Sequence, residues 1–248
     1  IVNKHLLILF TFSTYFCSAQ NQNLEKKTTR ALTYKVSYAI DSLYGITMFE
    51  ALNDRLGGDS IRFENGRASN GWKKDYYESG ELLHKGFYVD GRLKIYSNFY
   101  SNGDVERIFN AVDDYKSTMK IYYKGDILKS QIKYVGSSSR KWEDYYPNGI
   151  LEYYEEYHRS GDYYITEKWY YNTGQLKSLF VLTDKKNIKY LKKEFYEDGT
   201  VKTEGQFFYS KSMMDYLKTD TWKHFNKTGK LTKEQVYFFG KLDKETSY

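Results

Sequence analysis

The sequence has one cysteine, one proline and four histidines among its 248 residues. The cysteine, Cys17, lies near the amino terminus, so the rest of the chain has no thiol for a disulfide, a nucleophile or a thiolate metal site. The scarcity of proline excludes polyproline and collagen-like structures. No histidine pair at metal spacing, HExxH motif, GxSxG elbow or Gly-rich phosphate loop is present. We therefore expect no metal, no cofactor and no enzymatic activity.

Long hydrophobic runs are also missing, apart from one near the amino terminus. Lys4 and His5 precede an apolar run from Leu6 to Phe16, and the small residues Cys17-Ser18-Ala19 suit cleavage before Gln20. The run is too short for a membrane-spanning helix of about 20 residues. The pattern predicts a signal peptide over 1–19, and a protein exported to the periplasm or out of the cell.

Two alternatives to simple export remain. The apolar run suits a buried amino-terminal helix, and acylation of Cys17 would make a lipoprotein. The bulky Tyr15-Phe16 before Cys17 differs from the small residues of a lipobox, which disfavours the lipoprotein.

Aromatic residues are abundant: 28 Tyr, 15 Phe and 4 Trp. Aromatic side chains favour strands, so this composition indicates a β protein. Without Lys4, the expected mature chain has 37 basic and 32 acidic residues, a net charge of +5 that is interspersed along the sequence. Such mixing is typical of solvated strand faces, and we expect no nucleic-acid binding.

A block of two aromatics, two polar residues, glycine, any residue and an aliphatic recurs seven times, with one shorter copy. Its glycines are separated by 23, 22, 24, 25, 25 and 30 residues, which is the signature of a repeat architecture. The predicted turn glycines are Gly80, Gly103, Gly125, Gly149, Gly174, Gly199 and Gly229.

A second set of turn signals lies halfway between these glycines, at 89–91, 112–114, 135–139, 159–161 and 183–187. Two turns per repeat leave strands of about 5 to 8 residues. The strongest hairpin signals are Asp90-Gly91, Asn102-Gly103, Asn148-Gly149 and Asp198-Gly199, where we expect left-handed backbone. The sequence thus predicts an all-β fold, an elongated antiparallel meander of repeated hairpins over 59–248.

Three details refine this expectation. The four tryptophans precede block glycines by five to eight residues, so we expect their rings to stack one repeat apart. The extra segment 209–220 is expected to form a longer loop or a short helix. Within an amino-terminal segment over 20–58, apolar residues at near-helical spacing from Asp41 to Leu56 predict a short helix that caps the array.

The block YYPNGILEYYEEY and its sisters, with GW and KW lead-ins at Trp72 and Trp142, resemble the MORN-variant repeat of bacterial proteins known as YwqK-type antitoxins. The resemblance covers roughly 60 to 245 and implies a long sheet of stacked hairpins used for interaction, without catalytic residues. The chain departs from the pattern at Gly125, where the turn is one residue shorter, and at Asn226, where the second aromatic is missing.

Candidate chemistry is sparse. His84 and His224 lie within predicted strands, where a packing function outweighs a catalytic one. Acidic residues gather between 143 and 162, and two carboxylates about 5 to 10 Å apart are what a glycosidase needs. A solvated strand face explains the same residues and is the favoured interpretation.

The second aromatic of each block offers a candidate binding column. If one face of the sheet is open, these rings would bind a peptide, a protein or sugar rings; alternatively they are the sheet's own packing layer. The column comprises Tyr77, Tyr100, Tyr123, Tyr146, Tyr171 and Tyr196. Our preferred hypothesis is an exported, non-enzymatic scaffold that binds an unidentified protein or envelope component; the alternative is an envelope carbohydrate-binding or hydrolytic protein that uses the acidic 143–162 hairpin.

Overall fold

The computed structural model describes residues 33–46, 48–49 and 61–248. The expected signal peptide, 1–19, lies outside the described residues, as does most of the expected capping helix.

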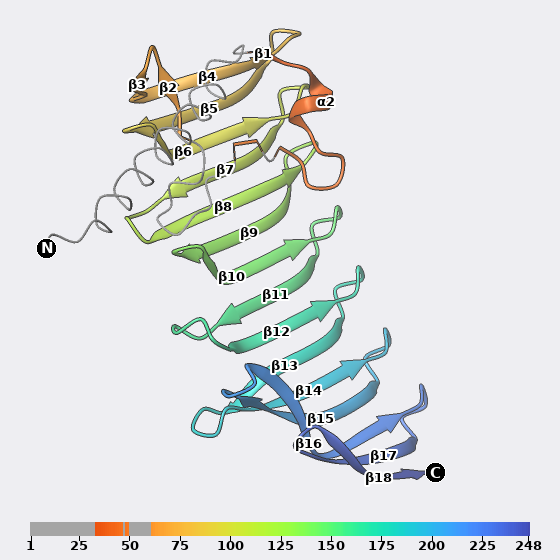
Figure 1. The fold of residues 1–248 in the computed structure, drawn as a ribbon. Helices are drawn as coiled ribbons and strands as arrows, with labels where there is room; N and C mark the ends of the chain where they lie inside the picture. The colour runs from red at the N-terminus through yellow and green to blue at the C-terminus, as the bar shows by residue number, and fades with distance from the viewer. Residues whose placement is uncertain (1–32, 47, 50–60) are drawn as a thin grey trace, which may run out of the picture. The chain divides into compact units, whose positions relative to one another are not determined.

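The described chain is almost entirely β-structure (Figure 1). Sixteen strands form one sheet whose order follows the chain from β4 to β18, with β1 beside β4, while β2 and β3 form a separate hairpin. The paired strands from β4 onward are antiparallel, which confirms the predicted meander. The elements are β1 (Thr33–Tyr34), α2 (Val36–Ala39), β2 (Phe63–Glu64), β3 (Arg67–Ala68), β4 (Gly71–Tyr77), β5 (Leu82–Val89), β6 (Arg92–Phe99), β7 (Val105–Ala111), β8 (Lys116–Tyr123), β9 (Ile127–Val135), β10 (Ser138–Tyr145), β11 (Leu151–Tyr157), β12 (Tyr164–Tyr170), β13 (Leu176–Asp184), β14 (Lys189–Phe195), β15 (Val201–Ser210), β16 (Asp215–Phe225), β17 (Leu231–Phe238) and β18 (Lys241–Ser247).

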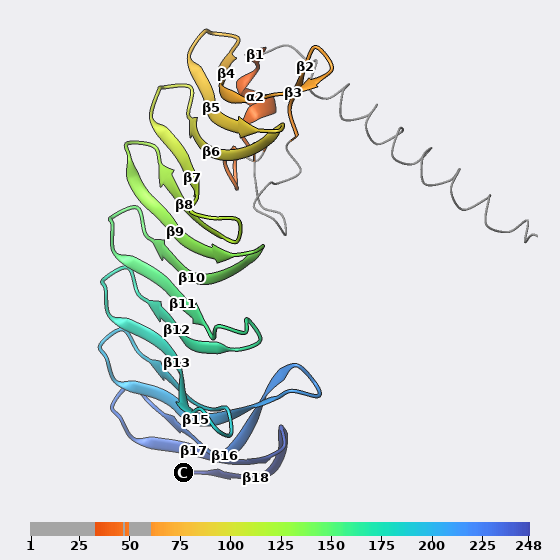
Figure 2. The same ribbon diagram turned by 90° about the vertical axis from the view of Figure 1, so that its left-hand side faces the viewer.

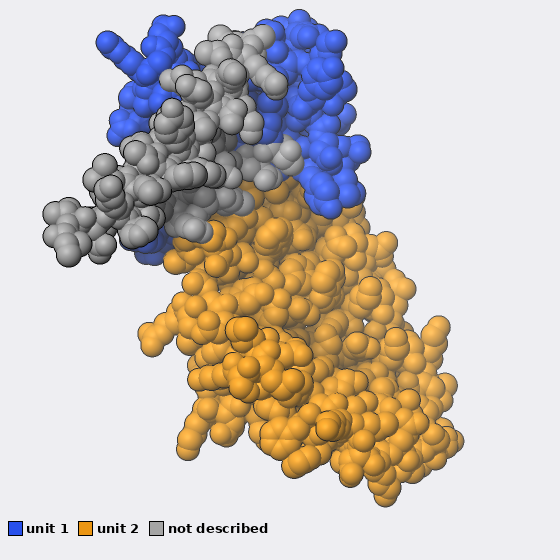
Figure 3. Space-filling view, in the orientation of Figure 1, with its two compact units in different colours: residues 1–117, 124–126 blue, residues 118–123, 127–248 orange. Residues whose placement is uncertain are grey.

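The chain divides into two compact units, coloured separately in Figure 3. Unit 1 comprises 1–117 and 124–126, and unit 2 comprises 118–123 and 127–248.

The seven predicted glycines close one kind of turn, and all have φ between 78° and 100°. In six of these turns the first residue donates its N–H to the carbonyl four residues later and accepts from the glycine N–H. This is a three-residue loop whose glycine lies in the left-handed region, where a side chain is strained. The aliphatic two residues after the glycine begins the next strand in full-length blocks, as Leu151 and Leu176 do.

The halfway turns also form where they are expected, but their backbone chemistry differs. Asp90 and Gly91 both have positive φ (48° and 76°), as predicted for a two-residue hairpin turn. The prediction was wrong for Asn102, Asn148 and Asp198: only the following glycine is left-handed, because these residues sit inside the three-residue loop.

The amino-terminal segment differs from the expected helix. The helix among the described residues, α2, spans Val36–Ala39 and ends before Asp41. From Asp41 the chain turns instead, because the Asp41 carboxylate accepts the N–H groups of Leu43 and Tyr44 and Gly45 is left-handed (φ 79°). The predicted start of the helix at Asp41 was therefore wrong, and 50–56 lie outside the described residues.

The segment 209–220 was expected to be a loop or a helix and is neither. It lengthens β15 and β16 to 10 and 11 residues and leaves only 211–214 as the turn. Tyr209 and Tyr216, at the ends of these strands, join an aromatic core in unit 2 around Phe180, Ile188 and Tyr190. Rings on adjacent strands pack against one another here, so the longer strands bury more aromatic surface than a loop would.

Candidate functional site

The tyrosines of the predicted binding column use their hydroxyls inside the sheet. Each of five donates to the backbone carbonyl of the residue just before the next turn of the same kind, at 2.8 to 3.0 Å. The pairs are Tyr77 with Phe99, Tyr123 with Tyr145, Tyr146 with Tyr170, Tyr171 with Phe195, and Tyr196 with Phe225. Successive hairpins are thus joined at their turns.

This geometry favours the packing alternative for the column. Tyr77 is only 1% exposed, so it has no surface for a ligand, and burial raises its pKa. Tyr100 and the four later tyrosines are half-buried. Asn226 replaces the tyrosine in the last of these turns among the described residues, where no later turn offers a carbonyl to a tyrosine hydroxyl. Its amide oxygen accepts the N–H groups of Thr228 and Lys230. Ligand binding by the column stays a prediction.

The four tryptophans do not stack on one another as expected. Trp72 packs on Phe87 (ring centroids 5.4 Å apart), Trp169 on Tyr153 (4.3 Å) and Trp222 on Phe207 (5.0 Å). The partners lie on the adjacent strand, because neighbouring strands are closer than successive repeats.

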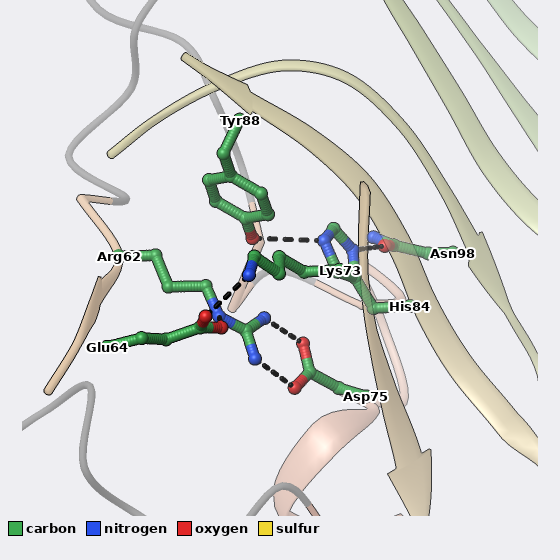
Figure 4. A network of polar contacts seen from close by, with 7 residues as sticks. All are labelled: Arg62, Glu64, Lys73, Asp75, His84, Tyr88 and Asn98. Atoms are coloured by element: carbon green, nitrogen blue, oxygen red, sulfur yellow. Dashed lines mark hydrogen bonds and ion pairs between the residues drawn. The ribbon is translucent and has the colours of Figure 1, made fainter. Parts of the chain in front are cut away.

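Unit 1 contains a polar network that is buried at Asp75 and exposed at Glu64 (Figure 4). Arg62 binds both carboxylate oxygens of Asp75, at 2.9 and 3.1 Å, and Glu64 lies between Arg62 (3.3 Å) and Lys73 (2.5 Å). Burial raises the pKa of Asp75, and the Arg62 guanidinium offsets only part of this effect. The ion pairs hold the β2–β3 hairpin against β4.

His84 lies beside these ion pairs and is fully buried. Its Nδ1 donates to Asn98 Oδ1 (2.8 Å), so Nε2 accepts from the Tyr88 hydroxyl (3.1 Å). Phe49 stacks on the imidazole with centroids 3.8 Å apart, and burial lowers the pKa of His84 to about 4. The histidine is neutral and structural at neutral pH, as the sequence led us to expect.

The chain's own amino-terminal segment covers this face in unit 1. The Ile46 N–H donates to Glu106 Oε1 (3.2 Å), and Arg107 Nη2 donates to the Tyr44 carbonyl (3.3 Å). Phe49 packs over His84. Side chains of the sheet therefore bind two backbone polar groups and one aromatic ring of the amino-terminal segment. This face therefore accepts a polypeptide segment.

In unit 2 the position of Asp75 is occupied by an aspartate in one repeat and by a tryptophan in the next. Asp144 and Trp169 lie two residues before Tyr146 and Tyr171, as Asp75 lies before Tyr77. The register places Trp142 opposite Glu155, Glu155 opposite Glu167, and Tyr153 opposite both Asp144 and Trp169, so all six share one face. We call Trp142, Asp144, Tyr153, Glu155, Glu167 and Trp169 the front strip.

Hydrogen bonds between residues two apart order the strip. The Trp142 indole donates to Asp144 (2.6 Å), the Tyr153 hydroxyl to Glu155 (2.6 Å) and the Trp169 indole to Glu167 (3.3 Å). Burial and then the bond to Glu155 raise the pKa of Tyr153. Side chains held in this way are preorganised, which lowers the cost of ordering them on binding.

The strip also brings two carboxylates opposite each other. Glu155 is only 8% exposed, and its hydrogen-bond donors are the neutral hydroxyls of Ser139 (3.1 Å) and Tyr153. Glu167 faces it directly, with Lys192 3.9 Å from the Glu167 carboxylate. Like charges on directly opposed residues destabilise a sheet, so a cationic group of a ligand would be favoured here.

The acidic 143–162 hairpin does not form one cluster. Asp144 and Glu155 belong to the front strip, whereas Glu143 and Glu156 lie on the other face with Lys141 and Tyr154. Glu152 is adjacent to Tyr153 and so also lies on that other face. That face is a half-buried ladder of mixed charge, in which Lys141 pairs with Glu143.

Sequence reasoning missed Glu167 and Trp169 as site residues. Their distance from the turn glycine would have identified them. Each glycine sets the register of the strand beside it, and the register assigns every strand position to one face of the sheet. Counting from the turns would have placed Trp169 beside Tyr153.

Among the residues that the structure describes, no group of three or more His, Cys, Asp or Glu is arranged to hold a metal ion. No described helix has the length and apolar character to cross a membrane.

Comparison with known protein families identifies one match. A family model described as MORN repeat variant matches residues 141–161 and 164–180, which confirms the resemblance for this part of the chain. No curated protein matches the sequence. The relation to YwqK-type antitoxins stays a prediction, and the front strip lies within a stretch that is similar to the MORN repeat variant.

Proposed function

We propose that this protein is an exported, non-enzymatic repeat scaffold that binds a segment of a partner protein across the front strip. The observation that carries the proposal is the pair of Trp169 and Tyr153. Trp169 is 40% exposed and rests on the Tyr153 ring, beside the opposed carboxylates of Glu155 and Glu167. Tryptophan and tyrosine are enriched at protein interfaces because their rings bury large area at low entropic cost.

The chain's own segment in unit 1 supports this function. Tyr44 and Phe49 bind there to Arg107 and His84, which lie four residues after Gly103 and Gly80, the repeat position of Tyr153 in the front strip. The front strip offers carboxylate acceptors and aromatic rings. The opposed carboxylates favour a partner segment with a lysine or arginine. MORN-variant repeats are interaction repeats, which agrees with a scaffold.

Export is supported by the sequence: a basic start, the apolar run Leu6 to Phe16 and small residues before Gln20. The partner would then be a protein of the periplasm, the cell surface or the medium.

Photo-crosslinking tests the proposal with two adjacent positions. A crosslinking amino acid replaces Trp169 on the front face, or Lys168 on the opposite face, in the full chain expressed in its host. A specific protein adduct from position 169 that position 168 does not give supports the proposal. Equal adducts from both positions, or none from 169 while both variants remain folded, would refute it.

A second candidate is carbohydrate binding or hydrolysis. It is favoured by one observation: Glu155 and Glu167 face each other on adjacent strands beside the rings of Tyr153 and Trp169, and a pair of carboxylates is what glycoside hydrolysis requires. A screen of glycans tests it with the wild type, Glu155→Gln and Glu167→Gln. Binding or turnover that both variants lose would favour this candidate over protein binding.

A further inference from the structure

The segment that covers the sheet of unit 1 is attached through few of its side chains. We call residues 41–46 and 48–49 the covering segment. Its Ile46 side chain is fully buried and its Phe49 ring is 8% exposed, whereas Leu43 is 67% exposed. The helix just before it, α2, lies on the same side of β4 and β5 as the β2–β3 hairpin (Figure 2). The covering segment thus presents two apolar anchors to the sheet and keeps other side chains in solvent.

The first part of the covering segment forms a loop that is closed by its own hydrogen bonds. Asp41 and Gly45 exchange backbone hydrogen bonds, at 3.0 and 2.9 Å. The Asp41 carboxylate accepts the N–H groups of Leu43 and Tyr44, both at 2.8 Å. Aspartate orders turns in this way without help from tertiary contacts. The loop is therefore preorganised, as a good ligand is, and docks on the sheet with little further ordering.

The sheet meets the covering segment with charged side chains. Glu106 and Arg107 on β7 are 0% and 2% exposed. The Glu106 carboxylate accepts the Ile46 N–H (3.2 Å), and the Arg107 guanidinium donates to the Tyr44 carbonyl (3.3 Å). Apolar side chains often hold a permanent cover equally well or better, because charged groups are costly to bury. We interpret Glu106 and Arg107 as groups that select a segment by its main chain.

The same contacts specify the sequence of the bound segment. Gly45 has φ 79°, and a Cβ there would collide with the Glu106 carboxylate, so both the backbone angle and the space require glycine. Ile46 fills a fully buried position directly after it. Phe49, three residues later, stacks on His84 with ring centroids 3.8 Å apart. The face therefore recognises a glycine, an aliphatic residue next to it, and an aromatic residue three positions further on.

We propose that this face of unit 1 is a peptide-binding site and that the covering segment is its internal ligand, which a partner segment with the same glycine, aliphatic and aromatic pattern displaces. The contact is autoinhibitory, because an internal ligand lowers the apparent affinity for a partner in proportion to the fraction of closed molecules. The front strip is a different site in the other unit, so this proposal goes beyond the proposed function and does not depend on it.

Peptide binding to the full chain tests the proposal. The probe is a fluorescent synthetic peptide with the sequence of residues 39–49, and the opening variant is Gly45→Val, which leaves the sheet unchanged. We expect the variant to bind the peptide more tightly than wild type by about tenfold or more, because its own segment no longer fits the site. The peptide should also raise the unfolding temperature of the variant. The same peptide with Gly45→Val should not bind.

The matched control is Gly66→Val in the β2–β3 turn. Gly66 also has a left-handed backbone (φ 74°), but a Cβ there meets no atom within 4 Å, so the substitution strains a turn of unit 1 and leaves the covering segment in place. This control should bind the peptide as weakly as wild type does. Phe49→Ser is a second opening variant, because it removes the ring that stacks on His84.

Circular dichroism and urea unfolding establish which variants are folded. The proposal is overturned if the folded opening variants bind the peptide no more tightly than wild type, or if Gly66→Val binds it as tightly as they do. It is equally overturned if neither opening variant folds, because the covering segment would then be part of the core and not a displaceable ligand.

Discussion

The hydroxyl of Tyr146 donates a hydrogen bond to the backbone carbonyl of Tyr170, 24 residues later, at 2.9 Å. The bond joins one tyrosine turn to the next, and equivalent bonds recur along the column. It explains why the second aromatic of a block is tyrosine where another such turn follows. Phenylalanine would fill the same space but would leave the carbonyl before the next turn without this hydrogen bond.

Replacing Tyr146 by phenylalanine should therefore lower the free energy of unfolding by about 1 kcal/mol, measured by urea denaturation. Tyr170→Phe is the control, because it removes a hydroxyl from the first aromatic of the next block and keeps the backbone carbonyl that Tyr146 uses. Equal losses in both variants would contradict the proposed link between turns.

Gly149 tests the turn backbone separately. Its φ is 81°, and a Cβ added there would meet no atom within 4 Å, so the cost of Gly149→Ala comes from the backbone alone. We expect a loss of about 1–2 kcal/mol in the free energy of unfolding, and a smaller loss for Gly149→Asn. Thermal unfolding of both variants measures the difference; alanine as tolerated as asparagine would be inconsistent with a left-handed Gly149.

Gly205 is needed for space and not for its backbone angle. The indole of Trp222 lies directly over it, where a Cβ would collide with the ring. Gly205→Ala should cost about 1–3 kcal/mol through overpacking. Trp222→Leu in the Gly205→Ala background should recover part of that loss, and a double-mutant cycle would show the coupling. If the losses of stability from the two substitutions simply add, residues 205 and 222 are not coupled.

His84 should make stability depend on pH. Its folded pKa of about 4 lies below the unfolded value near 6.5, so it stays neutral in the folded chain while the unfolded chain gains a proton. Stability is fully present above pH ~6.5 and falls as the pH drops to ~4, by roughly 3 kcal/mol in all.

Urea unfolding across this range, on wild type and His84→Gln, measures the contribution. The variant should lose stability at neutral pH, because it alters the buried bonds to Asn98 and Tyr88, yet show a shallower decline toward pH 4. Parallel pH profiles for the two proteins would mean that another group causes the decline. His158, which is stacked on Tyr163 in a turn, provides a matched histidine for the same comparison.

Much of the fold could be predicted because it depends on neighbours in the sequence. A glycine such as Gly149 must follow its tyrosine by three residues to close the loop, and side chains alternate faces from there. The helix from Asp41 failed because the Asp41 carboxylate binds the next N–H groups equally well in a turn, and Gly45 then reverses the chain. The local sequence pattern did not distinguish a helix from a turn at Asp41.

The sequence by itself determined the repeat, its turns, the register of the strands and the antiparallel meander, since these follow from backbone angles and side-chain alternation over a few residues. Only the tertiary structure decided which carbonyl each tyrosine binds, that Phe49 covers His84, and that Glu155 faces Glu167 beside Trp169. These contacts join residues 12 to 60 or more positions apart, and their energies depend on burial and on partners that no local pattern contains.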